Sequence, residues 1–183
     1  GEFVTMDTSV CHDEMFSFSG EINTPGLFYI SIPEAEERIK VFTEKGEISL
    51  LTQMEALDSV IVEGSESHRK FMEFERGNRP FEIMNDSLYN RYKKAKQNNR
   101  SHLAEALKDS FSLVDSKQKS YIIDFIKENP NSVVSEYIIL RNLWLLTLND
   151  LETIVPLLDS SLLQTEYMAQ IEEYIETLHR VKI

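Results

Sequence analysis

The order of hydrophobic and polar residues divides the chain into two parts. Over the first 64 residues, short apolar runs alternate with polar residues at every second position and are separated by turn sequences. This period of two is typical of strands with one buried face. From residue 65 onward, apolar residues recur every three or four positions, which is the spacing of one face of an α-helix. We therefore predict a β-region over residues 1–64 and a helical region over residues 65–183.

Six segments of the first part have the pattern of strands. In one of them Phe16 and Phe18 alternate with serine and would face one side, and the turn sequence Asn23–Gly26 follows. The predicted strands are Phe3–Met6, Met15–Gly20, Leu27–Ile32, Arg38–Thr43, Ile48–Leu51 and Ser59–Glu63. Glu44–Glu47 is predicted to be a hairpin turn between the fourth and fifth of these strands. Because the sequence starts without an initiator Met, we expect a processed or trimmed chain, with a strand or two upstream.

About six helices are predicted in the second part. Ser65 is the predicted N-cap of the first helix, because a serine hydroxyl accepts a hydrogen bond from the first turn. The segment Gly77–Pro80 is predicted to break or bend that helix. A largely buried helix is predicted over Val134–Leu148, and capping boxes are predicted to begin at Asn149 and Ser161. The predicted fold class is α+β, with an antiparallel β-sandwich-like half followed by an α-helical half.

The distribution of charge supports the same boundary and disfavours nucleic acid as a partner. The chain has 31 acidic and 19 basic residues and a net charge of -12, and nearly all of the excess lies in residues 1–64. A surface that follows a phosphate backbone needs the opposite sign. Positive charge is concentrated in one run, whose members are Arg91, Lys93, Lys94, Lys96 and Arg100. We interpret this run as a solvated helix face or as a partner for the acidic half.

Membrane insertion is not predicted for this chain. No stretch of about 18 apolar residues is present, since the most apolar segment is interrupted by Arg141, Asn142 and Thr147. The first residues also lack the basic and apolar segments of a signal peptide. We therefore expect no membrane span here.

Few residues suggest chemistry. Cys11 is the single cysteine, so this chain alone forms neither a disulfide nor a CxxC redox pair. His12 follows it directly and would point to the opposite side of an extended segment. The histidines, which are His12, His68, His102 and His179, lack the spacing of a metal site. We therefore predict no catalytic, cofactor-binding or metal-binding residue and no cofactor.

Two acidic clusters and two aromatic residues complete the candidates. The clusters are Glu34, Glu36 and Glu37 in a loop, and Glu172, Glu173 and Glu176 on a helix. The first lacks the ligand spacing of an EF-hand and the second lies on the polar face of an amphipathic helix, so we interpret both as solvated surface. Tyr137 and Trp144 suit either the core of a helix or an interface with a partner.

Several short motifs resemble a known bacterial module. The motifs are Met6–Thr8, Phe16–Gly20, Pro25–Ile30, Ile39–Gly46, Val60–Ser65 and Phe125–Ser132. In this order they resemble the N-terminal domain of unknown function in Bacteroidetes-type thiol–disulfide oxidoreductases of the AhpC/TSA family, which are TlpA/ResA-like. The resemblance implies a β-sandwich-like unit, a helical stretch and a later thioredoxin-like domain that carries the CxxC motif. It also implies a periplasmic or envelope location.

The resemblance favours a non-catalytic accessory module. Its expected partner is its own downstream thioredoxin-like domain, with substrate proteins or a second copy of the chain as further partners. Cys11 matches neither redox cysteine of that family, so no catalytic role is carried over to it. Two alternatives remain open at this stage. One is an enzyme with its own site in the cleft between the strands and the helices, and the other is a free-standing periplasmic protein that binds a ligand or protein there.

Overall fold

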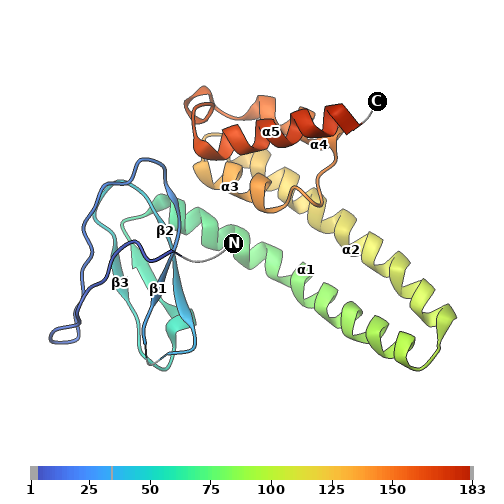
Figure 1. Ribbon diagram of the computed structural model, residues 1–183, viewed down its shortest axis with the longest axis horizontal. Coiled ribbons are helices and arrows are strands. Elements are labelled where there is room, and N and C mark those ends of the chain that lie inside the picture. The colour runs from blue at the N-terminus through green and yellow to red at the C-terminus, as the bar shows by residue number, and fades with distance from the viewer. Residues whose placement is uncertain (1–3, 34, 182–183) are drawn as a thin grey trace.

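The computed structural model describes residues 4–33 and 35–181, and the α+β class predicted from the sequence is confirmed within them. Short strands occupy one end of the molecule, and a long pair of helices extends away from them (Figure 1). Three shorter helices cover one side of this pair. The last strand ends at Glu63 and the first helix begins at Glu66, where the sequence predicted the change. Whether the two regions are separate domains stays a prediction.

The strands form two small antiparallel sheets. Strand β1 (Gly26–Ser31) pairs with β2 (Arg38–Thr43), and β3 (Ser49–Leu51) pairs with β4 (Ile61–Glu63). The predicted hairpin between β2 and β3 is therefore wrong. The Glu47 carbonyl packs directly against Gly64, whose φ of 86° turns the chain from β4 toward α1.

The first two predicted strands are not formed by the described residues. Residues 4–6 belong to no strand, and Phe3 lies outside the described residues. Phe16 and Phe18 face each other with ring centres 5.8 Å apart, so the predicted alternation is present. Their segment nevertheless pairs with no other strand, and Phe18 is 46% exposed. A strand needs a neighbour to satisfy its backbone, and the described residues show no sandwich.

Two long helices form an antiparallel hairpin. Helix α1 (Glu66–Gln97) continues through Pro80, so the sequence segment predicted to break or bend it does not break it. Helix α2 (Ser101–Glu128) also runs unbroken. The Tyr121 hydroxyl of α2 donates to the Phe74 carbonyl oxygen at 3.1 Å, and Gly77 leaves the room for that approach. Packing against α2 therefore supports α1 where proline removes a backbone donor.

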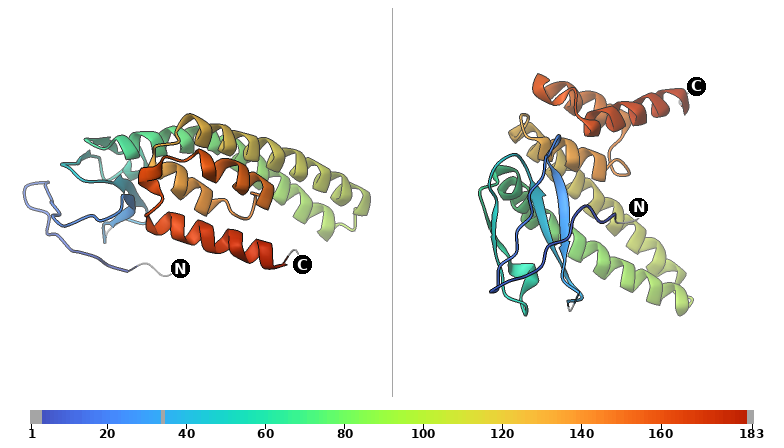
Figure 2. Two further views of the ribbon diagram at one scale, coloured as in Figure 1. Left: turned by 90° about the horizontal axis from the view of Figure 1, so that it is seen from above. Right: turned by 60° about the vertical axis from the view of Figure 1, so that its left-hand side comes forward.

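Three shorter helices lie along the hairpin. These are α3 (Val133–Arg141), α4 (Leu148–Ile154) and α5 (Glu166–Val181). Helices α3 and α4 contact the hairpin and α5 lies over them (Figure 2). The helix predicted to reach Leu148 ends early, because the Asn142 side chain bonds the Ile138 carbonyl at 2.8 Å and caps it.

Neither of the two predicted capping boxes forms at its predicted position. The capping box of α4 is formed by Thr147 and Asp150, two residues before the predicted position. Asp150 also pairs with Lys119 of α2 at 3.0 Å, and this contact fixes where α4 begins. Ser161 lies in a short 3₁₀ turn, and Thr165 caps α5 instead by accepting from the Met168 N–H.

The strands and helices share one hydrophobic core. Phe42 of β2 is fully buried against Phe71 of α1 and Tyr137 of α3, with ring centres 5.7 and 5.5 Å away. The opposite face of the first sheet packs in a smaller core with β3 and β4, centred on Ile39, Val41 and Leu57. Within the described part of the chain, no helix is both long and apolar enough to cross a bilayer.

Candidate functional site at the strand–helix junction

The first turn of α1 holds the outer edge of β2. Ser65 donates to the Phe42 carbonyl oxygen at 2.9 Å, and the Phe42 N–H donates to His68 Nδ1 at 3.2 Å. The His68 N–H in turn donates to Ser65 Oγ at 2.9 Å, so Ser65 is the helix cap that the sequence predicted. These bonds satisfy backbone groups that a strand edge would otherwise expose.

His68 is a structural residue of this junction. Burial lowers the pKa of its imidazole, which favours the neutral ring. Since Nδ1 accepts a hydrogen bond, the neutral ring carries its proton on Nε2. A neutral acceptor in this place keeps β2 attached to α1.

Glu44 provides a second link between the sheet and α1. Its carboxylate accepts from the Ser67 N–H at 3.0 Å and from the Ser67 hydroxyl at 2.6 Å. Burial acts to raise the pKa of Glu44, but the hydrogen bonds from Ser67 outweigh it and the pKa is lowered. A negative charge at the start of a helix is also favourable to the helix dipole.

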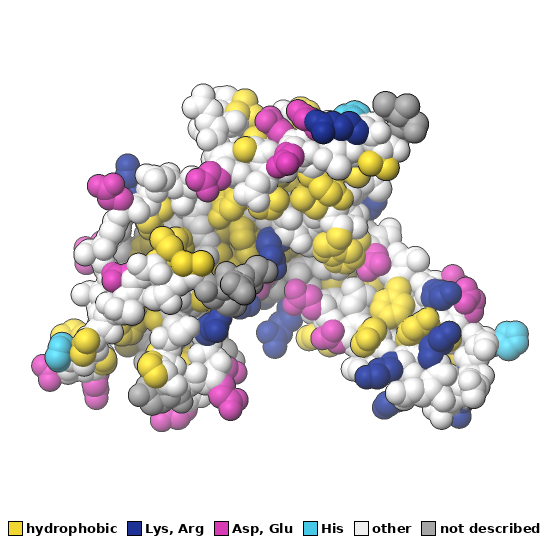
Figure 3. All heavy atoms as spheres, viewed as in Figure 1, with side chains coloured by type: hydrophobic (Ala, Val, Ile, Leu, Met, Phe, Trp, Pro, Cys, Tyr) yellow, Lys and Arg dark blue, Asp and Glu magenta, His cyan; other side chains and the backbone are white. Residues whose placement is uncertain are grey.

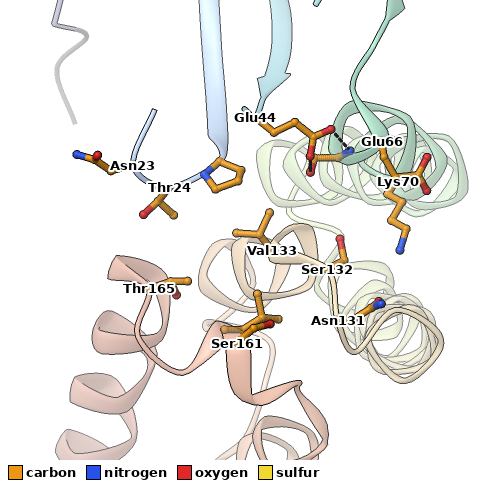
Figure 4. Close-up of a pocket in the computed structure, with 13 residues that line it drawn as sticks. Asn23, Thr24, Glu44, Glu66, Lys70, Asn131, Ser132, Val133, Ser161 and Thr165 are labelled. Atoms are coloured by element: carbon orange, nitrogen blue, oxygen red, sulfur yellow. Dashed lines mark hydrogen bonds between the residues drawn. The ribbon is translucent and has the colours of Figure 1, made fainter. Parts of the chain in front are cut away.

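A polar cavity of about 470 Å³ opens beside these bonds (Figure 4). Five segments distant in sequence form its wall: the loop before β1, the end of β2, the first turns of α1, the turn before α3 and the turn before α5. Hydroxyl, amide and charged groups dominate the lining, including Asn23, Glu44, Ser67, Lys70, Ser132 and Thr165. Within the described residues Lys70 has no ion pair, so the cavity offers a cation beside several hydroxyls. The arrangement suits a polar ligand.

A second hollow of about 260 Å³ lies between the first sheet, α1 and α3, and we call it the aromatic cavity. Phe71, Phe74 and Tyr137 form its inner wall, and both phenylalanines are buried. Lys40 and Arg141 also line it. This combination of aromatic and cationic groups offers apolar contact together with recognition of an anion.

The carboxylates of the aromatic cavity have partners. Glu75 lies 3.7 Å from Lys40 Nζ, and Glu82 accepts from Asn78 Nδ2 at 2.9 Å. Burial raises the pKa of Glu75, although Lys40 opposes the shift. Burial also raises the pKa of Tyr137 to about 12, although Arg141 opposes it, so its phenol stays protonated.

A buried carboxyl group lies in the helical core. Glu136 of α3 is fully buried, and its Oε1 accepts from the Thr165 hydroxyl at 2.7 Å. Its other oxygen has no hydrogen-bond partner among the described residues. Burial raises the pKa of Glu136 to about 7, although the bond from Thr165 opposes the shift. A carboxyl in this setting is largely neutral at mildly acidic pH.

The candidates named from sequence are dispersed. Cys11 is an exposed free thiol in the N-terminal segment, and the backbone of neighbouring His12 pairs with Met15. His179 lies 3.1 Å from Glu152, and His102 lies at the start of α2. Among the residues described, no three metal-binding side chains form a group.

The charged clusters lie at the surface. Glu36 and Glu37 are exposed in the loop before β2, Glu34 lies outside the described residues, and Glu172, Glu173 and Glu176 are exposed on α5. The basic run Arg91, Lys93, Lys94, Lys96 and Arg100 is exposed near the free end of the hairpin. Figure 3 shows dark blue side chains gathered there, far from the acidic strands. Within the described chain this run makes no ion pair, so it does not neutralise that half.

Tyr137 and Trp144 have different surroundings. Tyr137 is half-buried against the main core and the aromatic cavity, whereas Trp144 lies beyond the end of α3 and is 66% exposed. The sequence did not single out Glu136 or Arg141 as site residues. The serine at position 65 signalled the cap, because its hydroxyl can accept from the first turn, but nothing in the local sequence showed that His68 binds a strand.

Comparison with known proteins gives a family match over the first part of the chain. Residues 1–71 match a family described as a domain of unknown function (DUF4369). The match covers the strands and ends inside α1, so it includes Ser65, Ser67 and His68 at the junction. No curated protein and no solved structure gives a significant match. What the comparisons show is therefore a DUF4369 region at residues 1–71, with no link to thiol–disulfide oxidoreductases.

Proposed function

We propose that this chain is a non-catalytic accessory module of an envelope thiol–disulfide oxidoreductase, and that it binds a partner at the strand–helix junction. The observation that carries this proposal is the junction itself. Strands β1 and β2 meet helices α1 and α3 around two cavities, whose linings combine cations, hydroxyls and aromatic rings. Such convergent polar groups beside apolar walls are typical of binding sites.

The short motifs described above support the proposed context. Most of them fall within residues 1–71, the region that matches a domain of unknown function. In the proposed parent protein, a thioredoxin-like domain with CxxC follows Ile183, and the strands belong to a larger β-sandwich-like unit. The proposed location is the periplasm or the cell envelope.

The gene sequence and a redox assay test this proposal. We expect the codons after Ile183 to encode a thioredoxin-like domain, and we expect that parent protein to reduce insulin. Substitutions at the junction should slow insulin reduction, whereas reduction of a small aromatic disulfide by the CxxC motif should not change. A downstream sequence without a thioredoxin-like pattern would contradict the proposed context.

A free-standing ligand-binding protein is the second candidate. It is favoured by the polar cavity, because about 470 Å³ falls within the usual range for small-molecule sites. This candidate predicts that a polar metabolite raises the melting temperature of the chain, since a ligand that binds only the folded state stabilises it. Substitution of Lys70 by Gln should remove that shift.

A further inference from the structure

We infer that the aromatic cavity binds a carboxylate carried on an aromatic or branched aliphatic group, as found at the C-terminal residue of a partner protein. The inference deepens the proposed function, because it names the chemistry of the partner that the junction receives. It rests on the walls of the cavity, on two hydrogen-bond donors that have no acceptor in the described part of the chain, and on the ion pair and hydrogen bonds of the neighbouring carboxylates.

Aromatic side chains form one side of the cavity. Phe71 and Tyr137 pack edge to face with ring centres 6.0 Å apart, and Phe74 continues this side along α1. On the sheet side, Leu27 and Tyr29 alternate along β1 and therefore face the cavity together. A volume of about 260 Å³ exceeds the roughly 150 Å³ that holds benzene in an apolar protein cavity, so a phenyl ring with a short acidic group fits.

Two donors on α3 have no acceptor among the residues that the structure describes. Tyr137 and Arg141 are four residues apart, so they lie on the same face of the helix one turn from each other. Within the described residues the Tyr137 hydroxyl makes no hydrogen bond and Arg141 makes no ion pair. A guanidinium binds a carboxylate through two parallel hydrogen bonds, and a phenol can add a third.

The acidic side chains of the cavity do not satisfy these donors. Glu75 is paired with Lys40, and Glu82 is held by Asn78, which is itself fixed by a 2.9 Å bond from Gln118. Arg141 therefore contributes one uncompensated positive charge in a protein whose net charge is -12. The aromatic cavity should therefore bind an anion that carries an apolar group more tightly than it binds a cation.

A matched pair of small probes tests the inference on the full chain. N-acetyl-L-phenylalanine carries the carboxylate, and N-acetyl-L-phenylalaninamide is its uncharged counterpart. In titrations followed by amide chemical shifts, we expect the acid to bind at least about tenfold more tightly than the amide. Shifts should centre on β1, α1 and α3. A peptide ending in phenylalanine that binds better than phenylpropionate would identify a protein terminus as the source; the reverse would identify a small acid.

Two variants and one control locate the site. Arg141→Gln should reduce the affinity for the acid to that for the amide, about a tenfold loss, and Tyr137→Phe should cause a smaller loss. Arg91→Gln removes an exposed arginine near the tip of the hairpin and should change nothing. Circular dichroism should show that each variant is folded.

Three results would overturn the inference: equal affinity for acid and amide, no binding at about 10 mM probe, or unchanged binding by folded Arg141→Gln. None of them bears on whether a thioredoxin-like domain follows the chain. The converse result is also informative. If the gene encodes no thioredoxin-like domain but the chain still binds N-acetyl-L-phenylalanine selectively, only the proposed role in a thiol–disulfide oxidoreductase is contradicted.

Discussion

Replacing Glu136 by Gln should stabilise the protein, and the gain should grow with pH. The folded state holds the Glu136 carboxyl in the core with a pKa of about 7, whereas the ordinary value is 4.5. Between these pH values the unfolded chain releases a proton that the folded chain retains. Stability from this group is therefore complete below about pH 4.5 and is lost as pH rises toward 7. Glutamine keeps an oxygen for the Thr165 hydroxyl and carries no charge.

The size of the effect follows from the shift in pKa. One pKa unit corresponds to about 1.4 kcal/mol, so the full shift of 2.5 units is about 3 kcal/mol. Between pH 5.5 and 8, the stability advantage of Glu136→Gln over the wild type should widen by about 2 kcal/mol. Urea unfolding at constant ionic strength measures this difference. The exposed Glu128→Gln is the matched control and should show no such trend.

A pH-independent difference between the variant and the wild type would refute this reasoning. So would an advantage that grows toward acid, since that is the sign expected of a carboxylate stabilised in its charged form. If Glu136→Gln fails to fold, the pH dependence of wild-type unfolding still tests the claim. The wild type should then lose stability from about pH 6.5 to 8, above the range in which His68 changes its charge, once the contribution of surface charge is suppressed with salt.

Further substitutions test other parts of the fold. His68→Leu should cost about 2 kcal/mol in urea unfolding by leaving a β2 amide without an acceptor, and His68→Asn should cost less; equal costs would argue against the hydrogen bond. Because burial lowers the pKa of His68, its contribution should be lost as pH falls below about 6.5. Gly77→Ala should cost about 1–3 kcal/mol through collision with Tyr121 despite better helix propensity, whereas Gly20→Ala, with open space around it, should be neutral. Cys11→Ser should leave the melting temperature unchanged because the thiol is exposed, and a loss of several degrees would show a hidden contact.

The strongest local patterns predicted the fold best. Arg38–Thr43 was predicted as a strand and is one over the same residues, because its alternating side chains separate two cores. Met15–Gly20 has the same alternation but no neighbouring strand, and periodicity within a segment does not reveal whether a partner exists. Pro80 shows the opposite case, in which packing against another helix overrides a local signal to stop.

The candidate site was less predictable than the fold. Tyr137 was recognised as a residue of either a core or an interface, and it lines both the main core and the aromatic cavity. Arg141 lines that cavity because of where α3 packs against β2, and no local motif specifies this packing. Glu136 was hidden for a similar reason, since a single acidic residue in an apolar helix does not show that it faces the core.

The account holds that this chain acts by binding and not through its thiol. The most direct test is the rate at which the isolated chain catalyses insulin reduction by dithiothreitol, measured for the wild type and for Cys11→Ser. We predict that both rates equal the uncatalysed background. A wild-type rate clearly above background that disappears in Cys11→Ser would contradict the account.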